Sequence, residues 1–139
     1  MQALWLEGKQ LSLKDDIPVP KPLVGEALIK VRLAGICATD LELVKGYYPF
    51  CGVLGHEFVG EVVQAPERSE LIGKRVVGEI NIACGQCQEC IQGIPNHCEN
   101  RSVLGIVKWN GAFAEYLVLP VKNLYTVPEM IPDEVAVFT

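Results

Sequence analysis

The sequence has no long hydrophobic run and no excess of positive charge. Its 139 residues carry 12 Lys and Arg against 17 Asp and Glu, a formal net charge of −5. Nucleic-acid binding calls for clustered basic residues, and here they occur singly, so we expect no nucleic-acid partner. No stretch approaches the roughly 18 unbroken apolar residues of a membrane span, so we expect no membrane partner.

Export and dinucleotide-binding signals are also missing. The first ten residues, MQALWLEGKQ, have neither a basic n-region nor an apolar h-region, which predicts a cytoplasmic protein without a signal peptide. No G-x-G-x-x-G follows a strand, so the fingerprint of a Rossmann domain is absent from these residues. The composition, 50% hydrophobic and 21% charged, is typical of one globular domain with a real core.

Cysteine, by contrast, is concentrated in residues 83–100. The spacing there is C-x2-C-x2-C-x7-C, formed by Cys84, Cys87, Cys90 and Cys98. In a reducing cytosol, clustered cysteines are more often metal ligands or redox groups than disulfides. Four thiolates fill the corners of a zinc tetrahedron and leave no position for substrate, so the segment predicts a structural zinc lobe.

Two other interpretations of this cluster remain open. One is a pair of disulfides in a small loop. The other is an iron–sulfur cluster, because the first three cysteines match the C-x2-C-x2-C run of bacterial ferredoxins. The fourth does not match, since a ferredoxin expects C-x3-C-P, whereas seven residues intervene here and Glu99 follows Cys98.

The remainder of the chain is predicted to be mostly β. Residues 26–36 alternate, with Ala27, Ile29, Val31 and Leu33 on one face, which is the period of a half-buried strand. Many short strands at such intervals favour a sandwich or a partly closed barrel. Further short strands, bounded by Gly, Pro or charged residues, are expected at 9–15, 57–64, 73–80, 114–120 and 123–128.

Two short helices are expected. The first covers residues 39–46, with Thr39 or Asp40 as its cap and a glycine at its end. The second begins at Pro132, with acids in its first turn. The chain ends before this second helix is complete, so we expect a fragment of a longer protein.

A second set of zinc-binding residue types lies outside the cysteine-rich segment. Cys37 precedes the predicted helix 39–46, and His56 and Glu57 begin the strand 57–64. Three protein ligands with one open position make a catalytic zinc site. Taken singly, a lone cysteine is more often a small buried hydrophobe and a lone histidine a hydrogen-bonded structural residue, so both interpretations stand.

The order of these motifs resembles a known family. GICATDLELVKG, GVLGHEFVGEVV, GKRVVGE, CGQCQECIQGIPNHC and GAFAEYLVLP follow one another as in the N-terminal catalytic domain of zinc-dependent medium-chain alcohol dehydrogenases. The resemblance covers residues 1–139 and implies a GroES-like, partly open barrel or sandwich of short strands with a few short helices. It identifies the cysteine-rich lobe, 83–100, with the structural zinc site of that family.

The resemblance also implies roles for the second set of residues. Cys37 and His56 look like two ligands of the catalytic zinc, and Glu57 like the neighbouring glutamate that ligates the metal in some states. Asp40 matches the carboxylate that holds the ligand histidine, which would fix its tautomer. Thr39 matches the hydroxyl that relays the substrate's proton. The third ligand of the family lies just beyond the end of this chain.

The implied function is that of a zinc-dependent, NAD- or NADP-linked alcohol or polyol dehydrogenase, in which zinc polarises the alcohol or carbonyl oxygen during hydride transfer. The Rossmann cofactor domain follows this domain in the family, so we expect the chain alone to be inactive. The full-length protein is expected to be a homo-oligomer that acts on small-molecule alcohols or carbonyls. An iron–sulfur electron-transfer module and a non-enzymatic GroES-like interaction domain are the alternatives.

Other residues are interpreted as structural or left undecided. Cys51 is expected to be a buried free thiol, and His97 to be a surface residue. Tyr47, Tyr48 and Phe50 follow the first predicted helix, where they either line a substrate cleft or pack within their own loop.

Overall fold

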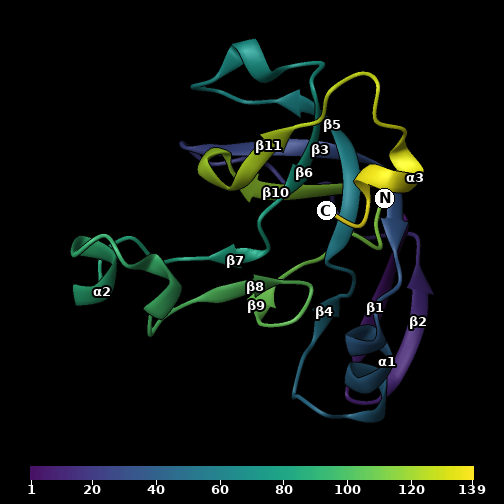
Figure 1. The fold of residues 1–139 in the computed structure, drawn as a ribbon. Coiled ribbons are helices and arrows are strands. Elements are labelled where there is room, and N and C mark those ends of the chain that lie inside the picture. Colours follow the sequence, from purple (N-terminus) through teal and green to yellow (C-terminus); the bar gives the residue numbers. More distant parts are fainter.

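A computed structural model describes residues 1–139, which form three β-sheets and three short α-helices (Figure 1). None of the helices is long and apolar enough to cross a membrane. The helices are α1 (Ala38–Lys45), α2 (Gln88–Ile91) and α3 (Asp133–Ala136), with 3₁₀ turns η1 (Ser69–Leu71), η2 (Pro95–His97) and η3 (Val121–Asn123). The strands are β1 (Ala3–Glu7), β2 (Gln10–Lys14), β3 (Glu26–Gly35), β4 (Gly52–Val53), β5 (Glu57–Gln64), β6 (Arg75–Gly78), β7 (Asn81–Ile82), β8 (Ser102–Leu104), β9 (Lys108–Trp109), β10 (Tyr116–Pro120) and β11 (Leu124–Thr126).

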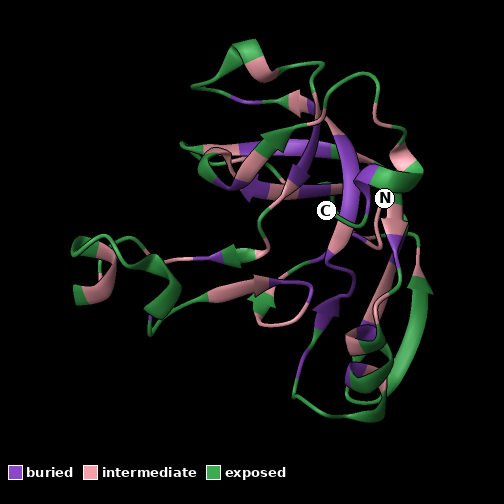
Figure 2. Cartoon of the chain, viewed as in Figure 1, coloured by how far each residue is buried: buried purple, intermediate pink, exposed green.

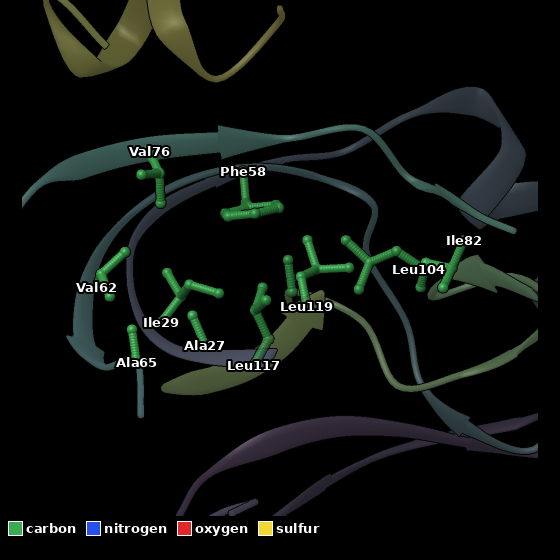
Figure 3. Close-up of a cluster of buried hydrophobic side chains, with 11 residues drawn as sticks. Ala27, Ile29, Phe58, Val62, Ala65, Val76, Ile82, Leu104, Leu117 and Leu119 are labelled. Carbon is green, nitrogen blue, oxygen red and sulfur yellow. The ribbon is translucent and has the colours of Figure 1, made fainter. Parts of the chain in front are cut away.

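The largest sheet has five antiparallel strands in the order β10-β3-β5-β6-β11. It curls into a half-barrel, and the side chains of its inner face point toward one another (Figure 3). Eleven buried apolar residues form this core, among them Ile29 and Val62, which are 0% exposed. Burying one such side chain contributes about 1.5–3 kcal/mol, so this cluster is the main source of stability. The expected mostly β architecture, a partly open barrel of short strands with a few short helices, is confirmed.

The alternation expected for residues 26–36 holds only as far as Val31. A register shift between Val31 and Leu33 interrupts the pairing of β3 with β5. A β-bulge adds one residue to a strand and moves the following side chains to the opposite face. The prediction that Leu33 faces the core is therefore wrong: it is 37% exposed, and Ala34 packs against the core instead.

Two smaller clusters complete the apolar packing. The sheet β2-β1-β4 and α1 enclose Leu6, Leu43, Phe50 and Leu54. The single turn of α3 buries apolar residues against β5 and β6. The prediction of a helix from Pro132 is confirmed as this one turn, in which Pro132 is the N-cap.

Residues 81–109 leave the half-barrel as an arm. The short sheet β7-β8-β9 forms its base, and α2 lies at its far end (Figure 1). Figure 2 shows this end of the arm as largely exposed. Among residues 83–100, only Cys98 is buried. Apolar packing therefore contributes little to the order of this segment.

The predicted strands at 9–15, 57–64, 73–80, 114–120 and 123–128 are confirmed as β2, β5, β6, β10 and β11. The sequence interpretation missed β1, together with β4, β7, β8 and β9, which have two or three residues each. The first helix is confirmed, but its N-cap is Cys37, whereas we expected Thr39 or Asp40. Asp40 occupies the third helical position, from which its side chain reaches back to the cap.

Candidate metal centres

The cysteine-rich arm brings four sulfur atoms together. The Sγ atoms of Cys84, Cys87, Cys90 and Cys98 all lie within 4.8 Å of one another, and none is in a disulfide. Sulfurs bound tetrahedrally to zinc at about 2.3 Å are about 3.8 Å apart, so a small contraction of this cluster would close around the ion. The arrangement suits one tetrahedral metal with no open position.

The thiols of this cluster do not ionise independently. The backbone N–H groups of Gln86 and Cys87 lower the pKa of Cys84 to about 6. The backbone N–H of Cys90 alone would lower the pKa of Cys87. Burial and the adjacent side chains of Cys90, Glu89 and Cys84 favour the neutral thiol more strongly, and together they raise this pKa to about 12. Four thiolates this close repel one another, and a bound cation would allow all four to be charged.

The register of the central sheet assembles the second cluster. Gly35, the last residue of β3, pairs with Glu57, the first residue of β5. Cys37 lies two residues beyond the end of one strand, and His56 lies one residue before the start of the other. The candidate ligand atoms of Cys37, His56 and Glu57 consequently lie within 4.8 Å of one another.

Glycine at position 35 leaves room for this arrangement. A Cβ atom added to Gly35 would lie 2.5 Å from the Glu57 carboxylate oxygen Oε2 and 3.2 Å from its Cβ. The carboxylate therefore occupies space that any other residue at position 35 would fill. The adjacent backbone, with positive φ at Gly55 (93°), turns the chain immediately before His56.

Asp40 links the helix cap to the histidine. Its Oδ2 accepts a hydrogen bond from the Cys37 backbone N–H at 2.9 Å, and its Oδ1 faces His56 Nδ1 at 3.4 Å. Both side chains are buried, and neither Oδ1 nor Nδ1 makes a hydrogen bond in the structure, so the 3.4 Å approach is the polar contact recorded between them. The carboxylate raises the pKa of His56 to about 8, against the effect of burial.

Thr39 lies against the sulfur of Cys37. Its Oγ1 is 3.6 Å from the Cys37 Sγ. The backbone N–H and the hydroxyl of Thr39, followed by His56, lower the pKa of the Cys37 thiol. The first turn of α1 thus favours a thiolate at the position where a metal ligand needs one.

A cleft of about 590 Å³ opens beside this second cluster. His56 and Glu57 line it, whereas Cys37 does not. The sequence interpretation assigned no site role to the other lining residues. They come from β6, the turn after it, β11 and the chain end, and only the first three belong to a quoted motif, GKRVVGE: Val77, Gly78, Glu79, Ile80, Tyr125, Phe138 and Thr139.

The aromatic residues after α1 take no part in this cleft. Phe50 is buried in the cluster with Leu6, and Tyr47 is 80% exposed. The prediction that Cys51 is buried is wrong, because it is exposed. His97 is a surface residue, as expected.

Comparison with protein families gives one match across most of the chain. Residues 24–129 match the alcohol dehydrogenase GroES-like domain. L-threonine 3-dehydrogenase of Xanthomonas oryzae pv. oryzae is 38% identical over 146 residues, covering 99% of this chain and 40% of that protein.

Solved structures agree in fold. An alcohol dehydrogenase (RspB) from Escherichia coli CFT073, complexed with NADH, has a TM-score of 0.90 and 39% identity, covering 99% of this chain and 41% of its own. A putative zinc-binding dehydrogenase from Sinorhizobium meliloti 1021, bound to NADP, has a TM-score of 0.84 and 36% identity, covering 95% of this chain and 40% of its own. The chain thus spans about two fifths of the length of these proteins.

Proposed function

Because this chain belongs to the alcohol dehydrogenase GroES-like domain family, we propose that it is the catalytic domain of a zinc-dependent, NAD- or NADP-linked alcohol or polyol dehydrogenase. The observation that carries the proposal is the convergence of Cys37, His56 and Glu57 beside a cleft. Since the chain spans two fifths of its relatives, the activity is proposed for the longer protein, with this chain alone inactive.

The second cluster offers sulfur, nitrogen and oxygen donors, a set that suits zinc. The pairing of buried His56 Nδ1 with only Asp40 Oδ1 supports this assignment, since it leaves Nε2 of the ring as the metal-binding nitrogen. When bound, zinc supplies Lewis acidity that polarises the oxygen of an alcohol or carbonyl substrate.

The protein's own groups prepare the site for this chemistry. Asp40 holds the His56 ring in one tautomer and, by its negative charge, increases the basicity of that ring. Because Asp40 also caps α1 through the Cys37 backbone N–H, one carboxylate positions two ligands at once. Glu57 is proposed as a third, exchangeable ligand or as a neighbour of the metal.

Thr39 is proposed to relay the proton of the substrate hydroxyl. Its Oγ1 lies 3.6 Å from the sulfur of Cys37, one of the residues that would hold the metal, so its hydroxyl belongs to the surroundings of the proposed site. A hydroxyl can accept a proton on one lone pair while donating its own, so it can pass the substrate's proton outward.

The four cysteines of the arm are proposed to hold a second zinc with a structural role. All four positions are taken by sulfur, so no substrate can bind there. In this proposal the four-cysteine centre stabilises the arm, and the centre at the cleft binds substrate.

Elemental analysis of protein purified without chelator tests both assignments, together with alcohol-dependent reduction of NAD or NADP by the full-length protein. We expect Cys84→Ser to remove one zinc and lower the melting temperature. Cys37→Ser should keep the structural zinc and the fold while abolishing activity. Cys51→Ser is the matched control, since this exposed thiol lies outside both clusters.

Other outcomes would select the alternatives. Iron with inorganic sulfide would favour an electron-transfer module. Zinc bound only to the arm, with no turnover of any alcohol or carbonyl by the full-length protein, would favour an interaction domain.

A further inference from the structure

We infer that Glu79 determines substrate specificity by accepting a hydrogen bond from a second hydroxyl or an ammonium group on the substrate. This inference rests on the proposed function and deepens it. It makes the substrate a diol, polyol or amino alcohol, in which a donor group lies near the reacting carbinol, in contrast to a simple alkanol.

Glu79 shares the cleft with the candidate catalytic centre. Its side chain is exposed and lines the same 590 Å³ space as His56 and Glu57. The rest of the wall is mainly apolar or aromatic, including Ile80 and Tyr125. An apolar pocket with a few placed polar groups is the usual form of a small-molecule site, in which the polar groups set specificity.

The backbone that carries Glu79 is held rigidly. The side chain of Asn123, which is 4% exposed, donates Nδ2–H bonds to the carbonyl oxygens of Glu79 (2.8 Å) and Asn81 (2.9 Å). The Asn123 carbonyl in turn accepts the Glu79 backbone N–H at 2.8 Å. A buried amide thus fixes the turn between β6 and β7. Such preorganisation lowers the entropic cost of binding.

The carboxylate is oriented but not neutralised. Its Oε1 accepts hydrogen bonds from the Asn81 backbone N–H (2.8 Å) and Nδ2–H (2.7 Å). Oε2 has no hydrogen-bond partner, and Glu79 forms no ion pair. One acceptor oxygen is therefore fixed in direction and remains available to a ligand.

The charge of the cleft restricts the ligand. Glu57 and Glu79 line it, and no lysine or arginine does. Glu57 belongs to the proposed zinc site, whereas no lysine or arginine of the cleft offsets the charge of Glu79, which disfavours an anionic group on the substrate beside Glu79. Glu79 favours a neutral group that donates a hydrogen bond, or a cation. A second hydroxyl and an ammonium group both donate such a hydrogen bond, and this is the chemistry that they share.

The test compares three substrates of the full-length protein that share one carbinol: isopropanol, propylene glycol and isopropanolamine. They differ only in carrying a hydrogen, a hydroxyl or an ammonium on the neighbouring carbon. We expect kcat/KM for at least one of the last two to exceed that for isopropanol by about tenfold or more, because a site built to bond a polar group discriminates against an analogue without it.

Two variants assign this preference to Glu79. Glu79→Leu removes the acceptor, so the ratio of kcat/KM for the preferred substrate to kcat/KM for isopropanol should fall toward one. Glu79→Gln keeps an acceptor of the same size without the charge, so it should lower the preference for isopropanolamine more than that for propylene glycol. Glu67→Gln, an exposed acid away from the cleft, is the control and should retain the wild-type preference. Melting temperatures identify any variant that fails to fold.

The outcomes separate this inference from the proposed function. If the wild type oxidises all three alcohols without preference, or if Glu79→Gln and Glu79→Leu both retain the preference, the role of Glu79 is overturned and the dehydrogenase assignment stands. If the wild type oxidises no alcohol and reduces no carbonyl, the proposed function fails, and this inference fails with it.

Discussion

If the four-cysteine cluster holds a metal as proposed, removing that metal should unfold residues 83–100 and leave the half-barrel intact. In this segment only Cys98 is buried. The hydrogen bonds between its backbone groups are local, such as Ile91 N–H to Cys87 C=O at 3.0 Å. Local hydrogen bonds form and break with the segment itself, so they do not anchor it to the core.

The magnitudes decide which interaction holds the arm in place. Structural zinc contributes about 10–16 kcal/mol in small cysteine-ligated sites. Burial of a side chain as small as that of Cys98 contributes roughly 1 kcal/mol. Without the metal, the apolar packing of this segment therefore contributes about ten times too little free energy to replace the contribution of the zinc.

Hydrogen exchange with mass spectrometry tests this prediction, with a chelator and a thiol reductant present. We expect exchange in residues 83–100 to accelerate at least about a thousandfold on metal removal, while amides of the core strands β3 and β5 keep their protection. Equal protection of the arm with and without metal would refute the reasoning, because it would mean that the segment is ordered by packing alone.

Two further predictions concern the half-barrel. Replacing Gly111 by alanine should lower the free energy of unfolding by about 3 kcal/mol in urea titrations, because its Cβ would lie 2.1 Å from the carbonyl oxygen of Gly55; an unchanged midpoint would contradict the close packing. Arg32, and after it Arg75, hold the pKa of Asp133 below its ordinary value. The stabilisation of the folded state by Asp133 is therefore complete above the pKa of this carboxyl in the unfolded chain, and it is lost as the pH falls through the lower pKa in the native protein. Asp133→Asn should lower the free energy of unfolding by about 1–2 kcal/mol at neutral pH. It should also weaken the fall of the melting temperature at acid pH, which is the acid limb of the pH profile. An acid limb identical to that of the wild type would show that other carboxylates control it.

The strands with clear periodicity could be predicted from the sequence. Residues 57–64 have the composition and length of a strand, and β5 occupies the same residues. The bulge that exposes Leu33 could not be predicted, because it depends on the pairing of β3 with β5, which a single strand does not encode. Strands of two residues, such as β4, are too short to show any period.

The two candidate metal-binding clusters differ in what made them predictable. The cysteines of the arm are close in sequence, so spacing alone predicted the cluster. Cys37 and His56 are brought together by the sheet register, and their prediction depended on the order of motifs typical of the family. Glu79 is the last residue of one of these motifs, GKRVVGE, but the sequence interpretation assigned it no role, and its place beside the candidate site appears only once the cleft is seen.

The segment before His56 is held by close contacts between backbone groups. The carbonyl oxygen of Gly55 accepts the Ala112 backbone N–H at 2.8 Å, and the carbonyl of Leu54 accepts that of Phe113 at 2.8 Å. A Cβ at Gly105 or Gly111 would lie within 2.2 Å of the Gly55 carbonyl oxygen. Backbone thus packs directly on backbone, which only glycine permits.

This packing connects the candidate metal ligand to a distant part of the chain. The position of His56 follows from that of Gly55, and Gly55 is held by residues 111–113. A substitution at Gly111 should therefore disturb metal binding at the cleft as well as stability, although it touches no ligand. The glycines of GVLGHEF and GAFAEY are accordingly required by backbone geometry, and the placement of His56 and Glu57, the proposed ligands, depends on them.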